Sequence, residues 1–341
     1  MALVFGAGKM GRAIAHDLMK QGLDVRICDL KDVSIKNFFK LDARNEKDVE
    51  REMKKEDIAI SALPYDFNYK LAKIAIKTKT NFIDLGGNSD IVRKELMLDE
   101  KAKKAEISII PDCGLAPGMT NIIAYHIWEN AKEMHIRVGG LPQKPKGVLK
   151  YSLFFSVHGL VNEYIEDSII IRNRKICRVK SLSGIEKIYF KGFKNLEAFY
   201  THGGTSTLLE TMKGIRNLDY KTVRYAKHAE KIKILKELGF FEKNARKFTE
   251  KILDKNLSKN EKDVVLARIY SEKRTAELID YYDEKENFSA MARTTGFPTS
   301  IIAKMVVDGE AEKGAKPPEL AIDGNKFLKE LKRRKIIWKI T

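Results

Sequence analysis

A glycine-rich turn near the N-terminus limits the folds open to this chain more than any other feature. A short apolar segment, residues 2–5, runs into the pattern G-x-G-x-x-G, and an apolar-periodic stretch that predicts a helix follows over residues 12–20. In such a strand–turn–helix unit the glycines allow a tight turn, a close pyrophosphate and close helix packing. The helix N-terminus then offers N–H groups to the phosphates. The turn therefore predicts a dinucleotide-binding site lined by Gly6, Gly8, Lys9, Met10 and Gly11.

Asp29 bears on which dinucleotide is bound. It follows the second predicted strand, residues 24–28, and lies roughly 20 residues after Gly11, where a carboxylate meets the ribose hydroxyls of NAD. A carboxylate there accepts hydrogen bonds from the 2′-hydroxyl and repels the 2′-phosphate of NADP. We therefore expect NAD, while the nearby cation of Lys31 keeps NADP open as the alternative.

The length and composition indicate a globular chain of two domains. Its 341 residues, 43% of them hydrophobic, can bury a sizeable core. No apolar run approaches the roughly 20 residues of a membrane span, and a strand starting at residue 2 leaves no room for a signal peptide. Cys28, Cys113 and Cys177 are widely spaced and are expected to be reduced thiols. We expect a cytoplasmic protein with no membrane partner.

The charge is strongly basic, with a formal net charge of +17. Such a charge can indicate a nucleic-acid partner. Here the lysines are spread along the chain and mixed with acids, and the one concentrated basic stretch, residues 326–339, adjoins no aromatic stacking platform. A solvated surface without a nucleic-acid partner is the expectation. Abundant Lys and Glu with only two glutamines, Gln21 and Gln143, favour a thermophilic host.

After Asp29, strands and helices alternate. Strands are predicted at residues 38–41, 58–61, 82–85 and 107–111, with helices at 46–54, 68–78 and 96–106. This spacing predicts parallel βαβ units and a doubly wound sheet covered on both faces. Ligands bind at the carboxyl ends of such strands, although an acid there is as often a turn former or helix cap. The further candidate cofactor residues at these ends are Asp42, Ala43, Ala62, Leu63, Pro64, Asp84, Gly86, Asp112, Gly114, Ala116 and Pro117.

From about residue 130 the pattern becomes rich in strands. Amphipathic strands are predicted at residues 134–138, 151–155, 169–172, 185–190, 197–200, 220–224, 264–270 and 276–282, with helices at 205–212, 226–238 and 288–307. Residues 243–260 are polar and predict a surface helix or a loop. We expect an inserted α+β domain with a largely antiparallel sheet. Residues 1–118, completed by 288–341, form the dinucleotide-binding domain, and residues 119–287 form the substrate and dimerisation domain.

A series of short blocks makes the chain recognisable. They are residues 6–11, 111–121, 138–142, 155–164, 196–199, 203–207, 221–228 and 293–298. In these blocks the chain resembles the saccharopine dehydrogenase-like family, and within it the lysine 6-dehydrogenases. The resemblance implies a Rossmann domain with an inserted α+β domain, a homodimer, and oxidation or formation of C–N bonds at amino acids with NAD or NADP. Two places depart from the family pattern: His202 precedes Gly203, and Ala226-Lys227 precedes His228.

The chemistry that the resemblance implies sets its own requirements. Oxidising the side-chain amine of lysine needs a neutral amine, a group that takes its proton and a water that hydrolyses the imine. A histidine suits these steps, and His158, His202 and His228 all fall in the matching blocks. We favour His228 as the base because Arg224, four residues earlier, could clamp the substrate's α-carboxylate bidentately.

Other residues could contact the substrate. Arg293 is a second candidate clamp or an interdomain salt-bridge partner. Glu163 and Tyr164 could bind the α-ammonium group or could simply cap and pack a helix, and His202 lies near the expected cleft. Cys113 is expected to be a small packing residue. The chain has no H-x-x-x-H or C-x-x-C spacing for a metal and no G-x-S-x-G turn of a hydrolase.

The sequence therefore predicts an NAD-dependent enzyme that deaminates the side-chain amine of L-lysine, or of a close relative, by oxidation. The alternative is an NADPH-dependent imine reductase of the saccharopine or carboxynorspermidine type. Its larger substrates would need more cations, for which the sequence offers Arg137, Lys150, Arg224 and Arg293. A remote alternative is a non-catalytic protein that senses dinucleotides or binds nucleic acid, which would explain the charge.

Overall fold

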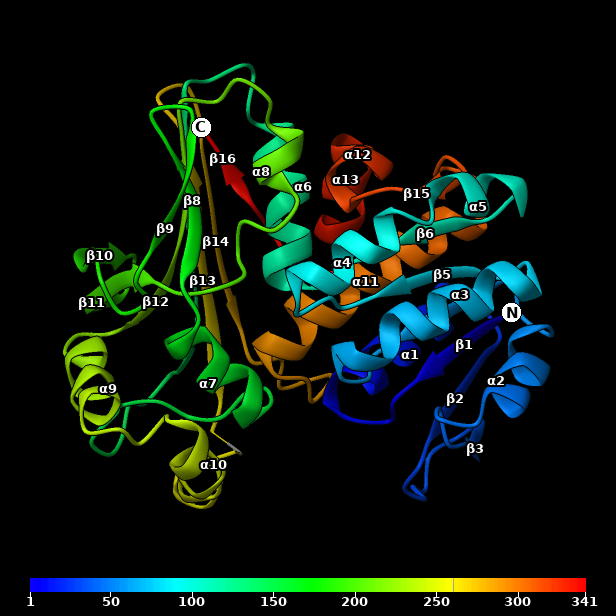
Figure 1. The fold of residues 1–341 in the computed structure, drawn as a ribbon, viewed down its shortest axis with the longest axis horizontal. Coiled ribbons are helices and arrows are strands. Elements are labelled where there is room, and N and C mark those ends of the chain that lie inside the picture. The colour runs from blue at the N-terminus through cyan, green and yellow to red at the C-terminus, as the bar shows by residue number, and fades with distance from the viewer. Residues whose placement is uncertain (260) are drawn as a thin grey trace. The chain divides into compact units, whose positions relative to one another are not determined.

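The structure is a computed structural model that describes residues 1–259 and 261–341. The chain divides into two compact units. Unit 1 comprises Met1–His126 and Ala292–Ile336, and unit 2 comprises Ile127–Met291 and Ile337–Thr341. A parallel doubly wound sheet in unit 1 and a second, mostly antiparallel sheet in unit 2 confirm the predicted fold class (Figure 1).

Among the described residues, the paired strands of the unit 1 sheet all run parallel. Its strands follow the order β15-β6-β5-β4-β1-β2-β3, which contains the strand order of a dinucleotide-binding fold. The strands are β1 (Ala2–Phe5), β2 (Val25–Asp29), β3 (Phe38–Lys40), β4 (Ile58–Ser61), β5 (Asn81–Asp84), β6 (Ser108–Ile110) and β15 (Gly314–Ala315). Because all of them run the same way, the predicted cofactor residues that follow β2 to β6 lie at one edge of the sheet.

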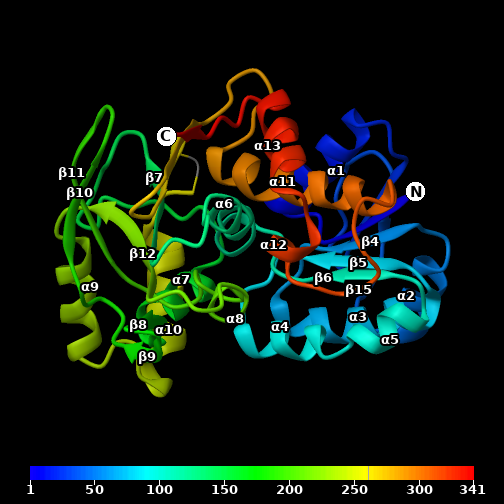
Figure 2. The ribbon, with the colours of Figure 1, turned by 90° about the horizontal axis from the view of Figure 1, so that it is seen from above.

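Helices cover both faces of this sheet. Figure 2 shows α1, α11 and α13 on one face and α2, α3, α4 and α5 on the other. Gly296 in α11 allows close packing on α1, because an added Cβ would lie 2.7 Å from the Cβ of Ala13. The helix bounds are α1 (Lys9–Lys20), α2 (Glu46–Met53), α3 (Asn68–Thr78), α4 (Ser89–Leu96), α5 (Asp99–Lys104), α6 (Thr120–His126), α11 (Ala290–Val307), α12 (Pro318–Ala321) and α13 (Gly324–Arg333).

One apolar cluster joins the sheet to α2, α3 and α5. It includes Leu3 and Phe5 of β1, Met53 of α2 and Leu71 of α3, all at most 1% exposed. Burial of such side chains stabilises the fold by about 1.5–3 kcal/mol each. The single helix predicted at residues 96–106 is wrong in its bounds: α4 and α5 are separate helices, and Asn88 caps α4 by accepting hydrogen bonds from its first turn.

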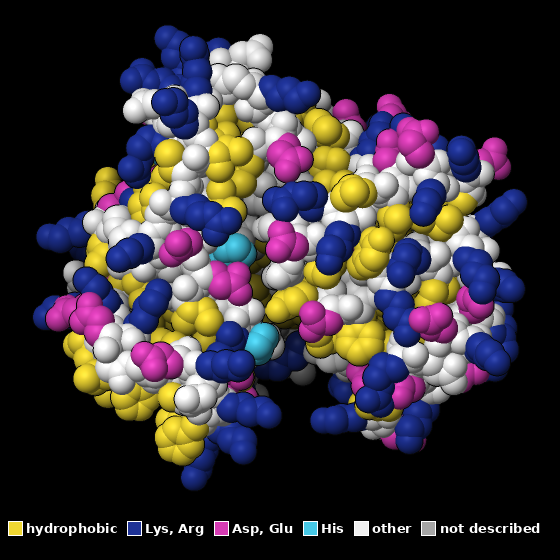
Figure 3. Space-filling view, in the orientation of Figure 1, with side chains coloured by type: hydrophobic (Ala, Val, Ile, Leu, Met, Phe, Trp, Pro, Cys, Tyr) yellow, Lys and Arg dark blue, Asp and Glu magenta, His cyan; other side chains and the backbone are white. Residues whose placement is uncertain are grey.

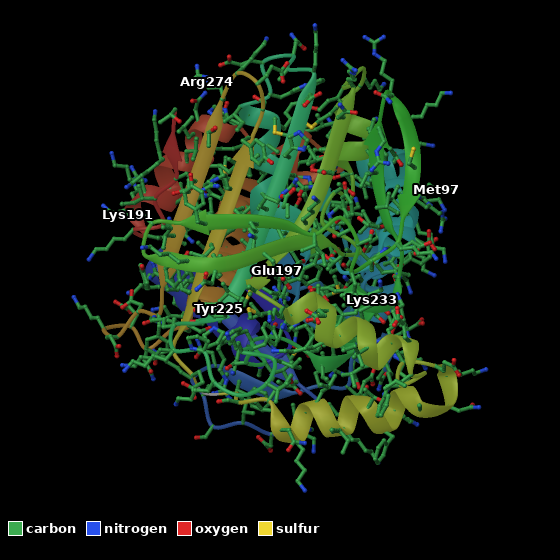
Figure 4. All side chains as sticks on the ribbon, turned by 90° about the vertical axis from the view of Figure 1, so that its left-hand side faces the viewer. Met97, Lys191, Glu197, Tyr225, Lys233 and Arg274 are labelled. Carbon is green, nitrogen blue, oxygen red and sulfur yellow. The ribbon has the colours of Figure 1, made fainter. Side chains whose placement is uncertain are left out.

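The sheet of unit 2 is mixed. Its strands follow the order β10-β11-β12-β7-β13-β14-β16, with the hairpin β8–β9 attached to β12. Strands β7 and β12 are parallel, and the other strand pairs among the described residues are antiparallel. Figure 4 shows the hairpin β10–β11, with Lys191 at its turn, crossing in front of the longer strands. The bounds are β7 (Glu133–Pro142), β8 (Ser168–Arg172), β9 (Lys175–Val179), β10 (Glu186–Phe190), β11 (Phe193–Tyr200), β12 (Asn217–Tyr225), β13 (Asp263–Tyr270), β14 (Thr275–Tyr281) and β16 (Lys339–Ile340).

Unit 2 also contains α7 (Val157–Ile165), α8 (Leu208–Thr211), α9 (His228–Glu237) and α10 (Lys243–Asn256). The strand predicted at residues 151–155 is wrong, because this buried apolar run is an irregular segment that leads to α7. Ser156 caps the start of α7 by accepting a hydrogen bond from the N–H of Gly159, a contact that the sequence pattern did not predict. The polar stretch predicted at residues 243–260 forms α10 over Lys243–Asn256. The last residue of that stretch, Asn260, lies outside the described residues.

Lysine and arginine are distributed widely over the surface. On the face in Figure 3, their side chains are interspersed with aspartate and glutamate over both units. Within the described part of the chain, no helix is long and apolar enough to cross a membrane.

Candidate functional site

The glycine-rich turn has the shape that its sequence predicts. Gly6 has a φ of +100°, and a Cβ added there would lie 2.8 Å from the carbonyl oxygen of Ala62. A Cβ on Gly11 would lie 1.8 Å from the carbonyl oxygen of Gly6, so neither position has room for a side chain. Gly8 is different, because no heavy atom of the described chain lies within 4 Å of its added Cβ. Gly8 is also the N-cap of α1, and no side chain of the described residues caps that helix.

Asp29 connects the end of β2 to this turn. Its Oδ2 accepts a hydrogen bond from the N–H of Ala7 at 2.8 Å, and its Oδ1 accepts one from the N–H of Lys31 at 3.0 Å. A carboxylate offers about four acceptor positions, so both oxygens can still accept hydrogen bonds from ribose hydroxyls. The open face at Gly8, the uncapped helix start and this carboxylate together suit the pyrophosphate and ribose of a dinucleotide.

The strand ends beyond Asp29 have differing environments. Asp42 receives a two-pronged ion pair from Arg44, with Nη2 2.7 Å from Oδ2, and these hydrogen bonds lower the pKa of Asp42 to about 2. After β4, Ala62 donates its N–H to the carbonyl of Phe5 at 2.8 Å, while Leu63 is half-buried and Pro64 is exposed. Ala43 is half-buried beside Asp42.

Asp84 and Asp112 bring the next two strand ends together. Oδ1 of Asp84 accepts hydrogen bonds from the N–H of Gly86 at 2.6 Å and of Asp112 at 3.4 Å. Burial raises the pKa of Asp84 to about 6. Glu95 of α4, which sequence reasoning missed, is fully buried beside them, and burial followed by repulsion from Asp84 raises its pKa to about 11. Asp84 therefore ties the loop after β5 to the loop after β6.

The loop after β6 is largely buried. Its segment η2 (Leu115–Met119) contains the cis peptide Ala116–Pro117 and has non-helical backbone angles at residues 116–118, and Met119 donates its N–H to the carbonyl of Gly114 at 2.8 Å. Burial raises the pKa of the Cys113 thiol well above its usual value. Cys113 is therefore a protonated packing residue rather than a thiolate nucleophile.

In unit 2, the side chain of Arg224 is the centre of a second candidate site. It extends from β12, is 3% exposed, and donates a hydrogen bond from Nη2 to Oε2 of Glu163 at 3.2 Å. The guanidinium carbon also lies 4.6 Å from the ring centre of Tyr151. Burial raises the pKa of Glu163, and Arg224 opposes that rise. A buried cation and a half-buried carboxylate therefore stand side by side.

His228 and Tyr164 stand beside this ion pair. The Tyr164 hydroxyl lies 2.8 Å from Nε2 of His228, and Nδ1 of His228 lies 3.0 Å from the carbonyl oxygen of Leu149. Since a carbonyl only accepts, Nδ1 carries the proton and Nε2 accepts the tyrosine hydroxyl. Burial, followed by the charge of Arg224, lowers the pKa of His228 to about 3. The imidazole is neutral and both of its nitrogens are engaged within the protein.

Glu197, for which the sequence suggested no role, fixes the start of the helix that carries His228. Lys227, in a left-handed conformation, precedes α9 and contributes no side-chain cap. Glu197, labelled on β11 in Figure 4, supplies the cap instead. Its two oxygens accept hydrogen bonds from the N–H groups of Lys227 at 2.8 Å and Ala229 at 2.7 Å. This carboxylate holds the helix N-terminus and thereby positions His228.

The remaining candidates have other partners. His202 lies with Nε2 3.1 Å from Glu166, and the side chain of His158 is 54% exposed beside Glu250. Arg293 belongs to unit 1, where it donates a hydrogen bond to the carbonyl of Arg334 at 3.1 Å. The roles predicted for His202 and Arg293 stay predictions. No group of three or more His, Cys, Asp or Glu side chains could hold a metal ion within residues 1–259 and 261–341.

Comparisons with known proteins agree with this architecture. Residues 2–110 match the family description "Saccharopine dehydrogenase NADP binding domain", and residues 114–337 match "Saccharopine dehydrogenase C-terminal domain". A mitochondrial alpha-aminoadipic semialdehyde synthase from Bos taurus is 24% identical over 77% of this chain and 38% of its own length. A saccharopine dehydrogenase of Pyricularia oryzae, described as NADP(+), L-glutamate-forming, is 24% identical over 77% of this chain and 65% of its own length. The chain thus spans less than two thirds of either relative.

A solved structure shows the same fold. The apo saccharopine dehydrogenase (L-Glu forming) from Saccharomyces cerevisiae superposes with a TM-score of 0.79 at 19% identity, covering 100% of this chain and 99% of that one. The family matches together extend over most of the sequence, in the order in which the two domain types occur. The chain belongs to the saccharopine dehydrogenase family of oxidoreductases, with its dinucleotide-binding domain in residues 2–110.

Proposed function

We propose that this protein oxidises the side-chain amine of L-lysine, or of a close relative, with NAD. The observation that carries the proposal is the pairing of Arg224 with Glu163 in unit 2. A cation and a carboxylate held next to each other are complementary to the α-carboxylate and α-ammonium groups of a free amino acid. An amino acid held by this end keeps its side chain available for reaction.

The proposed cofactor is held by Gly6, Gly8, Gly11 and Asp29. The carboxylate of Asp29 supports NAD, because it repels a 2′-phosphate. When bound, a nicotinamide dinucleotide would take the hydride that the amine carbon loses. The matched domain and the fungal relative are named for NADP, which makes NADP the alternative. The homodimer and the substrate and dimerisation roles of residues 119–287 also remain predictions.

The chain's own residues then have distinct tasks. Arg224 would bind the carboxylate, and Glu163 the ammonium group. The hydrogen-bond pattern supports an indirect role for His228, the proposed base: Tyr164 would accept the proton of the reacting ammonium as its own hydroxyl proton passes to Nε2. Burial and the charge of Arg224 lower the pKa of His228, so the imidazolium that this transfer would form is disfavoured and the transfer would be brief.

The second candidate is an imine reductase of the saccharopine type, which the names of the relatives favour. Its substrates carry more carboxylates, so several free cations should line the site. Of the cations that the sequence offers in unit 2, Arg137 is engaged by Glu186 and Asp219, and Lys150 is exposed. Arg224 is also paired, with Glu163, but its Nε has no acceptor among the described residues, which supports a substrate with a single carboxylate at this end.

A spectrophotometric panel tests the two functions. Amino acids are supplied with NAD⁺ or NADP⁺ and followed at about 340 nm, and the reverse reaction is run with NADPH, an amino acid and an aldehyde. Reduction of NAD⁺ by L-lysine, lost in Arg224→Ala, supports the proposal. Oxidation of NADPH only when both an amino acid and an aldehyde are present would replace it with the reductase.

A further inference from the structure

The hydroxyl group of Tyr151 is a buried donor without a partner. The residue is 4% exposed, and its hydroxyl makes no hydrogen bond to any residue that the structure describes. Its ring is held firmly, edge-on to Phe154 at 5.9 Å and to His228 at 5.6 Å between ring centres. Buried polar groups are almost always paired, so an orphaned hydroxyl inside a polar cluster indicates a missing partner.

A second orphaned donor lies beside it. Nε of Arg224 is buried and has no acceptor among residues 1–259 and 261–341, whereas the two terminal nitrogens of the same guanidinium donate to Glu163 and to the carbonyl of Val223. The guanidinium stacks on the Tyr151 ring at 4.6 Å. The Nε–H of arginine can only donate, and the tyrosine hydroxyl can also donate. A single group that satisfies both atoms must therefore be a hydrogen-bond acceptor.

We propose that Tyr151 is a specificity-determining residue whose hydroxyl joins Nε of Arg224 in binding one carboxylate of the substrate. The inference rests on the proposed function in taking that carboxylate to belong to an amino acid. One oxygen accepts from the tyrosine and the other from Nε of the guanidinium, while Glu163 stays paired with Nη2 and binds the ammonium group. An amine without a carboxylate leaves both donors unpaired, so the site rejects it.

A matched pair of tyrosine variants tests the role of the hydroxyl. Tyr225 follows Arg224 on β12, so its side chain lies on the other face of the sheet, where its hydroxyl donates to the carbonyl of Pro142 at 2.9 Å. Cadaverine lacks the carboxylate and should be the poorer substrate of the wild type. Tyr151→Phe should raise the KM for L-lysine about ten-fold or more without raising the KM for cadaverine. Tyr225→Phe should leave the ratio of the KM for L-lysine to the KM for cadaverine as it is in the wild type. Equal ratios in Tyr151→Phe and the wild type would overturn the inference.

Binding to the wild type provides a test that does not depend on a variant folding or on turnover. Thermal shifts are recorded with NADH and, in parallel, NADPH, using L-lysine, L-glutamate, 6-aminohexanoate and cadaverine as probes. The inference expects the three carboxylates to stabilise the protein more than cadaverine does. No stabilisation by any carboxylate, or equal stabilisation by cadaverine, overturns it.

The two readouts separate this inference from the proposed function. If L-lysine is not oxidised but L-glutamate or 6-aminohexanoate binds in a Tyr151-dependent way, the proposed function fails and the carboxylate site stands. If L-lysine is oxidised and Tyr151→Phe leaves the lysine-to-cadaverine ratio unchanged, the function stands and the role of Tyr151 fails.

Discussion

The candidate site of unit 1 is built mainly from backbone groups, whereas the candidate site of unit 2 is built from side chains. At the glycine-rich turn of unit 1, the important features are backbone: two glycines with no room for a Cβ, one with open space, and a helix start. In unit 2, the site consists of side chains that come from separate segments, with Tyr151 before α7, Glu163 within it, Arg224 on β12 and His228 on α9.

This difference has consequences for what each site tolerates. A site made of backbone groups loses its ligand when a new side chain obstructs it. Its N–H and C=O groups do not titrate near neutral pH. A side-chain site fails when one charge or hydroxyl is removed, because the buried partner is left unpaired. The comparison predicts that steric substitutions should dominate in the turn, and that charge and pH should dominate in unit 2.

The largest effect is expected for Gly11→Val. The first side-chain atom would lie 1.8 Å from the carbonyl oxygen of Gly6, so the helix must move away from the turn. We expect a loss of about 3 kcal/mol or more in the free energy of unfolding, measured by denaturant titration. Gly8→Val is the matched control, because its Cβ meets no neighbour. It should unfold like the wild type and yet bind NAD more weakly by fluorescence titration; unchanged affinity would place the phosphates elsewhere.

In unit 2, acidification should reveal the buried neutral His228. Its folded pKa of about 3 lies below the unfolded value of about 6.5, so the unfolded chain binds the proton more readily. The stability that the neutral imidazole contributes is fully present well above pH 6.5 and is lost as the pH falls toward 3. At pH 4 the loss should be about 3 kcal/mol. His228→Asn removes the titrating imidazole. Thermal unfolding should therefore show that the stability of this variant falls less steeply between about pH 6.5 and pH 4 than the stability of the wild type. Parallel curves for the two proteins would mean that His228 is not held neutral.

Local patterns were sufficient to predict most of unit 1. The bounds of β1, β4 and α3 coincide with the predictions, because each is a short apolar or amphipathic run between clear turn residues. The glycine spacing likewise anticipated where Gly6 and Gly11 allow no side chain. By contrast, the predicted strand at residues 151–155 was wrong, because a buried apolar run has no period that separates a strand from an irregular buried segment.

Sequence reasoning was weaker where contacts are distant along the chain. It singled out Arg224 and His228 from a four-residue spacing, but on β12 and α9 their neighbours are set by pairing with β11 and by α7. Tyr151 lies outside the matching blocks and Glu197 lies within the block 196–199, but only the fold shows an orphaned hydroxyl in one and a helix cap in the other. Their roles depend on tertiary contacts, which no local pattern encodes.

Removal of the charge in the unit 2 site should chiefly affect substrate binding. Arg224→Ala should raise the KM for L-lysine about 10- to 100-fold with a smaller change in kcat, corresponding to about 1.5–3 kcal/mol for a charged hydrogen bond. Arg224→Lys keeps the charge but loses the planar fork, and should lie between Ala and the wild type in steady-state kinetics. A variant with normal KM and low kcat would mean that Arg224 acts on the reaction rather than on the carboxylate.

The smallest effect is expected at Asp29, which combines the two kinds of construction because its side chain supports the backbone turn of unit 1. Its Oδ2 accepts the N–H of Ala7, so Asp29→Ser would remove both a negative charge and an anchor of the turn. Asp29→Asn separates them: the amide oxygen can still accept from Ala7, while the charge that repels a 2′-phosphate is gone. Asp29→Asn also loses the hydrogen bond from the N–H of Lys31, so a small loss of thermal stability is expected. We expect it to bring the affinities for NAD and NADP about ten-fold closer together in parallel fluorescence titrations. Asp29→Ser should weaken both cofactors as well. If the wild type already binds NADP at least as tightly as NAD, the charge of Asp29 does not select the cofactor, and the reductase becomes the better proposal.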